Sequence, residues 1–265
     1  MNRIDRKFRE LKKRKQKALI AFLTAGDFGL STTKKLVLEF DRRGADIIEL
    51  GVPFSDPVAD GPVIQASSER ALKRGTKLKD IIKLVKRLRS STEIPVVLMG
   101  YYNPVLKYGL KKFVSDCAGS GVDGVIIPDL PPDEAEDLIA EAKKRDFATI
   151  FLLSPTSTPD RIKIVSKKSK GFIYYVSLTG ITGARANLPK ELSSRVRLIK
   201  RYSNKPVCVG FGVSRPEQVR EIARMAEGVI VGSAIVKEIE KDAKRKDFIR
   251  RVGDYVQKLT EASHQ

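Results

Sequence analysis

Short apolar segments alternate with amphipathic segments along almost the whole chain. The apolar segments are rich in strand-forming residues, and each is followed by a loop and then by a stretch with helical spacing of apolar residues. This alternation predicts eight strands, at Ala18–Leu23, Ile47–Leu50, Val96–Met99, Gly124–Ile127, Thr149–Leu153, Phe172–Val176, Val207–Val209 and Gly228–Val231.

Helical patterns lie between these strands. Ser31 precedes one periodic run, and proline occupies the first turn after Thr158 and after Arg215, which are common signals of a helix N-terminus. The charged, periodic N-terminus predicts a leading helix rather than a secretory signal. The other predicted helices are Ser31–Arg43, Ile64–Arg74, Leu78–Arg89, Leu110–Ser120, Pro132–Arg145, Pro159–Lys168, Leu192–Tyr202, Pro216–Met225 and a last stretch from about Asp247 to Thr260.

Eight alternations of strand and helix in a chain of 265 residues predict a (β/α)8 barrel. The competing fold is a doubly wound open sheet. Its usual Gly-x-Gly-x-x-Gly after the first strand is missing, and Thr24-Ala25-Gly26-Asp27 stands there instead. No linker marks a second domain. We therefore expect a single domain over residues 1–265, with a leading helix at 1–16, the barrel core at 17–236 and a C-terminal helical segment and tail at 237–265.

The composition is that of a soluble globular protein, with 42% hydrophobic and 31% charged residues. No apolar run reaches the roughly 18–20 residues that a membrane span requires. The formal net charge is +19, but the basic residues recur along many predicted helices with acidic residues among them. A solvated outer ring of helices explains this pattern better than a nucleic-acid-binding surface, since no nucleic-acid-binding motif accompanies it.

Cysteine and histidine are too scarce for several kinds of site. Cys117 and Cys208 stand far apart, so we expect two buried thiols in a reducing cytoplasm and neither a disulfide nor a metal site. The only histidine is His264, in a C-terminal tail that we expect to fray. Ser-His-Asp and Cys-His catalysis are thereby excluded, and acid/base chemistry must use carboxylates, tyrosine or lysine.

The run from Glu49 to Pro62 places one carboxylate at the end of an apolar strand and another in a Pro/Gly loop. Strand alternation puts Glu49 on the same face as Ile47, where a core side chain is expected. Burial there would raise the pKa of Glu49 toward the range of a general acid/base. A buried structural carboxylate paired with Arg or Lys fits the pattern equally well.

Other polar residues follow predicted strands in the same way. Asp60 lies in the loop after the second strand, Asp129 follows the fourth, and Tyr174 lies on the sixth. Reacting groups of such barrels lie at the C-terminal ends of the strands, so these residues are expected to converge on one mouth.

Glycines follow the sixth, seventh and eighth predicted strands, in Thr179–Gly183, Gly210–Ser214 and Gly232-Ser233. Glycine lets backbone N–H groups approach an anion, and barrels often hold a phosphate at these loops. The alternative to a phosphate site is that these glycines only form tight turns.

The long segment Ser177–Pro189 is either a lid over a ligand or a disordered loop. An apolar slot above the barrel, or ordinary core, would include Phe22, Met99, Leu152 and Phe211.

Taken together, these motifs resemble the alpha subunits of tryptophan synthase. The resemblance runs from about Lys17 to Val236, and its most specific part is the loop from Glu49 to Pro62. It also rests on Phe22–Asp27, Gly100-Tyr101-Tyr102-Asn103-Pro104, Pro128-Asp129-Leu130-Pro131, Ser154–Thr158, Gly180–Arg185 and Gly210-Phe211-Gly212.

The resemblance implies a (β/α)8 barrel that cleaves indole-3-glycerol phosphate into indole and glyceraldehyde 3-phosphate without metal or cofactor. By this resemblance Glu49 is the acid/base, Asp60 binds the indole N–H, Tyr174 lies beside Glu49, and Thr182 reaches Asp60. Indole contacts are implied for Phe22, Met99, Leu152 and Phe211, and phosphate contacts for Gly183, Gly212, Gly232 and Ser233.

The resemblance also implies a partner, a beta subunit that holds pyridoxal phosphate and receives indole through a tunnel in an alpha2-beta2 assembly. The docking surface would include Pro53, Asp56, Pro57, Asn103, Asp129, Pro131 and Arg185. Two other functions stay open on the residues alone. The glycine loops are shared by other phosphate-binding barrels, such as sugar-phosphate isomerases, and the basic surface would suit a binding or scaffold protein.

Overall fold

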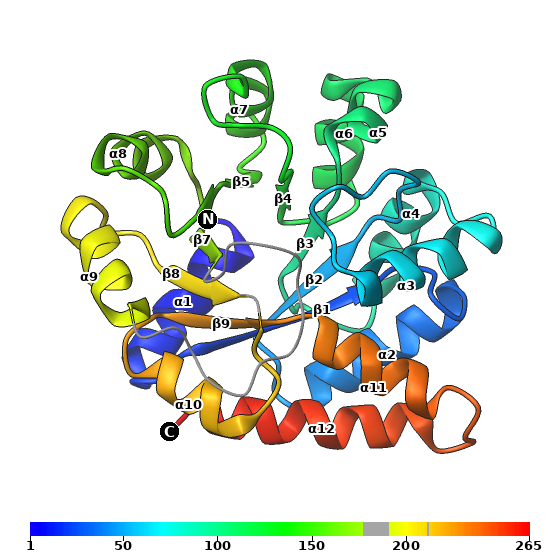
Figure 1. The fold of residues 1–265 in the computed structure, drawn as a ribbon. Coiled ribbons are helices and arrows are strands. Elements are labelled where there is room, and N and C mark those ends of the chain that lie inside the picture. Colours follow the sequence, from blue (N-terminus) through cyan, green and yellow to red (C-terminus); the bar gives the residue numbers. More distant parts are fainter. Residues whose placement is uncertain (177–190, 211) are drawn as a thin grey trace.

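The computed structural model describes residues 1–176, 191–210 and 212–265. Its centre is a parallel sheet of nine strands in the order β5-β4-β3-β2-β1-β9-β8-β7-β6, surrounded by helices (Figure 1). The (β/α)8 prediction is confirmed. The strands are β1 (Ala18–Thr24), β2 (Ile47–Gly51), β3 (Val96–Met99), β4 (Gly124–Ile126), β5 (Ala148–Ile150), β6 (Leu152–Leu153), β7 (Ile173–Val176), β8 (Val207–Gly210) and β9 (Gly228–Val231).

The ninth strand arises because the predicted fifth strand is interrupted at Phe151. β5 pairs with β4 and β6 pairs with β7, so these two segments stand at opposite ends of the sheet order and are joined directly through the chain. Ile150 and Leu152 both contact the inner core, whereas Phe151 packs in the outer one. The barrel therefore closes at this break.

The helices cover the outside of the barrel. Helix α5 (Tyr102–Tyr108) is not expected from the pattern, and α7 (Glu136–Lys143) begins after Pro131-Pro132 and a turn rather than at Pro132. The helices are α1 (Arg3–Lys13), α2 (Leu30–Arg42), α3 (Pro62–Lys73), α4 (Leu78–Leu88), α5 (Tyr102–Tyr108), α6 (Leu110–Gly119), α7 (Glu136–Lys143), α8 (Pro159–Lys168), α9 (Leu192–Tyr202), α10 (Pro216–Ala223), α11 (Ser233–Asp242) and α12 (Phe248–Ser263).

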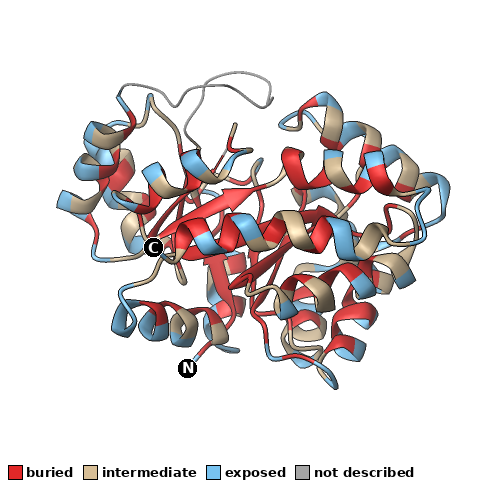
Figure 2. Ribbon diagram, turned by 90° about the horizontal axis from the view of Figure 1, so that it is seen from below, coloured by how far each residue is buried: buried red, intermediate tan, exposed pale blue. Residues whose placement is uncertain are grey.

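The outer helices are amphipathic, as the spacing predicts. In α4, Ile81 and Val85 are buried against the sheet while Lys83 and Lys86 are exposed. Figure 2 shows the same division across the molecule, with buried strands at the centre and exposed stripes on the outer faces of the helices. Basic side chains on outer helix faces thus account for part of the net charge.

Two core layers arise from strand alternation. Residues that face into the barrel, such as Ile47, Val97 and Ile126, form one cluster, which Ile4 and Phe8 of α1 complete at the N-terminal end of the barrel. The outward-facing residues pack beneath the outer helices in a second cluster. Because side chains of the strands and of α1 fill the N-terminal end of the barrel interior, ligands can approach only the C-terminal ends of the strands.

The expectation of a frayed C-terminus was wrong. α12 continues to Ser263, and Nε2 of His264 lies 3.0 Å from Oδ2 of Asp46. The same Asp46 oxygen accepts the Leu19 backbone N–H at 2.9 Å. A buried carboxylate thus holds the end of the chain, which local sequence could not reveal. Within the described residues, no helix has the length and apolarity to cross a membrane.

Candidate active site

Glu49 lies inside the barrel near the C-terminal end of β2. Its neighbours in register are Phe22 on β1 and Val97 on β3, and its side chain is 1% exposed. Oε2 has no hydrogen-bond partner in the described structure. Burial, with a smaller contribution from the charge of Asp60, raises the pKa of Glu49 to about 8. The alternative of a structural ion pair is not supported, because the described residues place no Lys or Arg within 4.0 Å of this carboxylate.

Asp60 lies in the loop between β2 and α3 and is partly buried. Burial raises the pKa of Asp60 to about 6, and a hydrogen bond from the Tyr101 side chain opposes the shift. Between pH 6 and 8 the arrangement therefore keeps Glu49 protonated and Asp60 ionised. A reaction that needs one carboxylic acid to donate a proton and a second, ionised carboxylate to stabilise positive charge requires this difference between neighbouring groups.

Tyr174 faces the barrel interior from β7, and its side chain interacts electrostatically with Glu49. Burial raises the pKa of Tyr174 well above its usual value, so this phenol stays neutral. Gly210 on β8 leaves room for the ring, since a Cβ there would lie 2.6 Å from the Tyr174 hydroxyl oxygen. Tyr174 is thus suited to hydrogen bonding and not to acting as a base.

Apolar side chains surround this group at the C-terminal ends of the strands. Phe22 of β1, Met99 of β3 and Leu152 of β6 all face inward. Phe22 also packs against Ile64 of α3 and Val236 of α11, two contacts that the sequence analysis missed. Those residues lie on helices far apart in sequence, and only the closed barrel brings them together.

The candidate phosphate residues fall partly within the described structure. Gly212 has a φ of +78°, a conformation that favours glycine. Gly232 is the N-cap of α11, Ser233 is its first residue, and no side chain caps this end. The first N–H groups of a helix lack partners within the helix and can bind an anion. Outside the described residues lie Thr182, Gly183, Arg185 and Phe211, together with all of Ser177–Pro189.

The described residues of the predicted partner surface lie in the loop after β2, in α5 and in the loop after β4, at the same end of the barrel. Asp56 and Asn103 are exposed, Asp129 is exposed and accepts the Tyr102 backbone N–H at 2.9 Å, and Pro57 and Pro131 are partly exposed. Pro53 is buried, so it can only support the surface from beneath.

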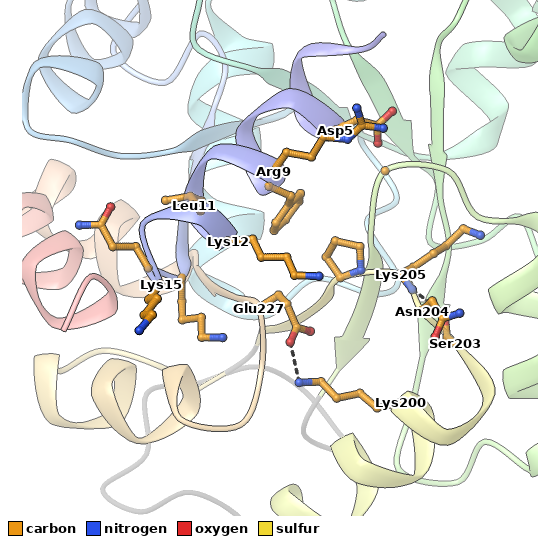
Figure 3. A pocket seen from close by; sticks show the side chains of 15 residues that line it. Asp5, Arg9, Leu11, Lys12, Lys15, Lys200, Ser203, Asn204, Lys205 and Glu227 are labelled. Carbon is orange, nitrogen blue, oxygen red and sulfur yellow. Dashed lines mark hydrogen bonds and ion pairs between the residues drawn. The ribbon is translucent and has the colours of Figure 1, made fainter.

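A different hollow, of about 740 Å³, lies at the opposite end of the barrel between α1 and the start of β8 (Figure 3). Five lysines are among its fifteen lining residues. Nζ of Lys200 lies 2.6 Å from Oε1 of Glu227, whose other oxygen accepts the Val207 backbone N–H. Lys205 extends away from this pair. The hydrogen bonds and ion pair of Glu227 are contacts that stabilise the N-terminal end of the barrel. We therefore look for the catalytic site at the C-terminal ends of the strands.

Comparison with known proteins shows the family to which the chain belongs. The family model described as tryptophan synthase alpha chain matches residues 8–264. The chain belongs to the tryptophan synthase alpha chain family. The alpha chain of Citrifermentans bemidjiense is 51% identical over 98% of this chain and 97% of its own length, and that of Caldanaerobacter subterraneus is 49% identical over 98% and 99%.

Solved structures of the family have the same fold. The alpha subunit from Legionella pneumophila superposes with a TM-score of 0.92 at 38% identity, covering 99% of this chain and 98% of that one. A chain in a tryptophan synthase structure from Mycobacterium tuberculosis gives 0.92 at 35% identity, covering 100% and 99%.

As a tryptophan synthase alpha chain, this protein is a lyase of tryptophan biosynthesis that cleaves indole-3-glycerol phosphate into indole and glyceraldehyde 3-phosphate. The alpha chain carries no cofactor, and it works with a beta subunit that holds pyridoxal phosphate. The comparisons do not support the sugar-phosphate isomerase or the basic binding protein that the residues alone left open.

Proposed function

We propose that Glu49 and Asp60 carry the cleavage, with Tyr174 positioning Glu49. The protonated Glu49 donates its proton to C3 of the indole ring, and the ring becomes an electron sink. The Asp60 carboxylate accepts a hydrogen bond from the indole N–H and stabilises the positive charge on the ring. The Glu49 carboxylate then accepts the proton of the adjacent glycerol hydroxyl. The bond from C3 to that carbon breaks, its electrons return to the ring, and indole and an aldehyde leave.

The remaining site residues are proposed to hold the substrate. Phe22, Met99 and Leu152, with Phe211, contact the indole ring, and Thr182 approaches Asp60. Phosphate binding is assigned to Gly183, Gly212, Gly232 and Ser233. Anchoring a remote phosphate fixes the orientation of the reacting carbon, which supplies a large share of the rate.

The observation that carries this proposal is the contrast between a fully buried Glu49 and a partly exposed Asp60, with pKa values of about 8 and 6. We expect a bell-shaped pH dependence of kcat/KM, with apparent limbs near these two values that belong to the coupled pair. An indole-release assay from pH 5 to 9 checks this. The substrate phosphate also titrates near ~6, so the acidic limb is assigned by its loss in Asp60→Asn. A profile without a basic limb would contradict the role of Glu49.

Replacing Gly232 with alanine is expected to raise KM for indole-3-glycerol phosphate about tenfold with little change in kcat, because a methyl group would stand where an anion approaches the backbone. The fold should tolerate the change, since the added Cβ would lie 3.5 Å from Phe22, an ordinary contact. Gly119→Ala is the matched control, because nothing lies within 4 Å of a Cβ there. An unchanged KM would remove Gly232 from the phosphate site.

We further propose that residues 1–265 form one domain and that it works in the cytoplasm within an alpha2-beta2 assembly. The packing of α1 into the barrel and of α12 against α2, α10 and α11 supports a single domain. The partner surface assigned to Pro53, Asp56, Pro57, Asn103, Asp129, Pro131 and Arg185 extends over the C-terminal end of the barrel. Indole release with and without a beta subunit, followed by the same assay on Asp56→Ala, tests the assembly.

A further inference from the structure

Tyr101 links the end of β3 to the loop that carries Asp60. Its hydroxyl oxygen accepts the Ala59 backbone N–H at 2.9 Å. The same hydroxyl donates a hydrogen bond to the Asp60 carboxylate. A phenol has one proton to donate and lone pairs that accept, so both interactions can exist at once. The Tyr101 hydroxyl thus forms hydrogen bonds with two consecutive residues of the loop, Ala59 and Asp60.

Tyr101 is itself firmly held. Its side chain is 4% exposed, and its ring centroid lies 5.3 Å from that of Phe54. The Gly100 N–H before it donates to the Ile126 carbonyl at 3.1 Å, and the Tyr102 N–H after it donates to Asp129 at 2.9 Å. The hydroxyl therefore projects from a rigid strand end.

The loop has few other contacts that could fix the carboxylate. The Val58 N–H donates to the Asp56 carbonyl, the Asp60 N–H donates to the Pro57 carbonyl, and Nε2 of Gln65 donates to the Asp60 carbonyl. These hydrogen bonds involve the backbone of the loop. None of them holds the Asp60 carboxylate. Ser55, Asp56, Val58 and Ala59 are exposed.

The groups that face Asp60 include no positive charge within ion-pair distance among the described residues. Glu49 of β2 and Tyr174 of β7 interact with it electrostatically, and Asp129 interacts with Tyr101 from the loop after β4. Burial works against ionisation of Asp60. The phenol hydrogen bond works in its favour.

We propose that Tyr101 is a positioning residue of the cleavage reaction, whose hydroxyl fixes the Asp60 carboxylate and keeps it ionised. The inference rests on the proposed role of Asp60. It goes further by assigning a function to a side chain on another strand, one that needs no contact with the reacting atoms.

The test is Tyr101→Phe, which removes one oxygen and keeps the ring against Phe54. We expect the acidic limb of kcat/KM to move about one pH unit upward, because a hydrogen bond to a charged group is lost. At pH 6.5 kcat/KM should fall about threefold, and near pH 8 the loss should be smaller. A residue that merely supports the fold would lower activity evenly across the range.

Tyr108→Phe is the matched control. The Tyr108 hydroxyl donates to Asp116 at 2.7 Å, away from the site, so its loss should leave the profile unchanged. Carboxyl-carbon NMR titration of free protein labelled at aspartate gives a second readout that does not depend on turnover or on the substrate phosphate. Asp60→Asn identifies the Asp60 signal.

The outcomes separate the two ideas. If Asp60→Asn keeps full activity and the acidic limb, the proposed role of Asp60 fails. If Asp60→Asn loses activity but Tyr101→Phe leaves both the limb and the Asp60 NMR titration in place, the role of Asp60 stands and the inference about Tyr101 is wrong. An upward shift in both measurements, absent in Tyr108→Phe, supports it.

Discussion

Replacing Glu49 with glutamine is expected to lower the rate of indole formation by about 10⁴-fold or more. A single acid/base typically contributes about 10²–10⁴-fold, and Glu49 is assigned both the protonation of the ring carbon and the removal of the hydroxyl proton. Glutamine has nearly the same shape but can neither give nor take a proton. The measurement is indole release at pH 7 with enzyme in excess of any contaminating activity.

Substrate binding should survive this change, because phosphate and indole contacts lie on other residues. A dissociation constant for indole-3-glycerol phosphate within about threefold of the parent, by calorimetry, would show an intact site. Glu69→Gln serves as the control, since Glu69 is an exposed residue on the outer face of α3. A Glu49→Gln rate within tenfold of the parent would remove Glu49 from the proton-transfer role.

The same Glu49→Gln variant is expected to be more stable than the parent at high pH. Burial raises the pKa of Glu49 from 4.5 to about 8. Between those values the folded protein keeps a proton that the unfolded chain has released, so the parent loses folding stability as pH rises through this window. At about 1.4 kcal/mol per pKa unit, the loss from pH 5 to pH 9 is about 3–4 kcal/mol.

Glutamine does not titrate, so the difference in free energy of unfolding between Glu49→Gln and the parent should widen in favour of the variant by that amount. Urea unfolding at pH 5 and pH 9 measures it, and other titrating groups cancel in the comparison. Glu69→Gln should show no such widening. A constant difference for Glu49→Gln would mean that the Glu49 carboxyl is not desolvated in solution. Both expectations have one physical cause, since the burial that makes Glu49 a useful acid also opposes its ionisation.

Sequence alone predicted the parts of the fold that depend on local pattern. Continuous apolar runs locate the strands, and the period-2 rule places Glu49 on the inner face beside Ile47. The break at Phe151 escaped prediction because an uninterrupted apolar run carries no signal for where a closing barrel must bend. α5 escaped because its seven residues, Tyr102–Tyr108, are too few for a periodic pattern.

Long-range contacts were beyond the sequence. The hydroxyl of Tyr101 accepts from Ala59 across 42 positions, and His264 meets Asp46 across 218. Nothing in the local pattern distinguishes these side chains from others of their kind. Burial of Glu49 could be anticipated from alternation, whereas the loop that supports Asp60 depends on how three strand ends meet.

The leading helix also bears on how the protein is synthesised. Phe8 of α1 packs against Phe172, at a ring-centroid distance of 6.0 Å, and the Asn2 side chain donates to the Asp123 and Asp146 carbonyls. Helix α1 is synthesised before the strands that it packs against, and these include Cys208 of β8 and Ile230 of β9 as well as Phe172. The apolar stripe of α1 is therefore fully covered only after β8 and β9 have been made, so α1 completes its docking late.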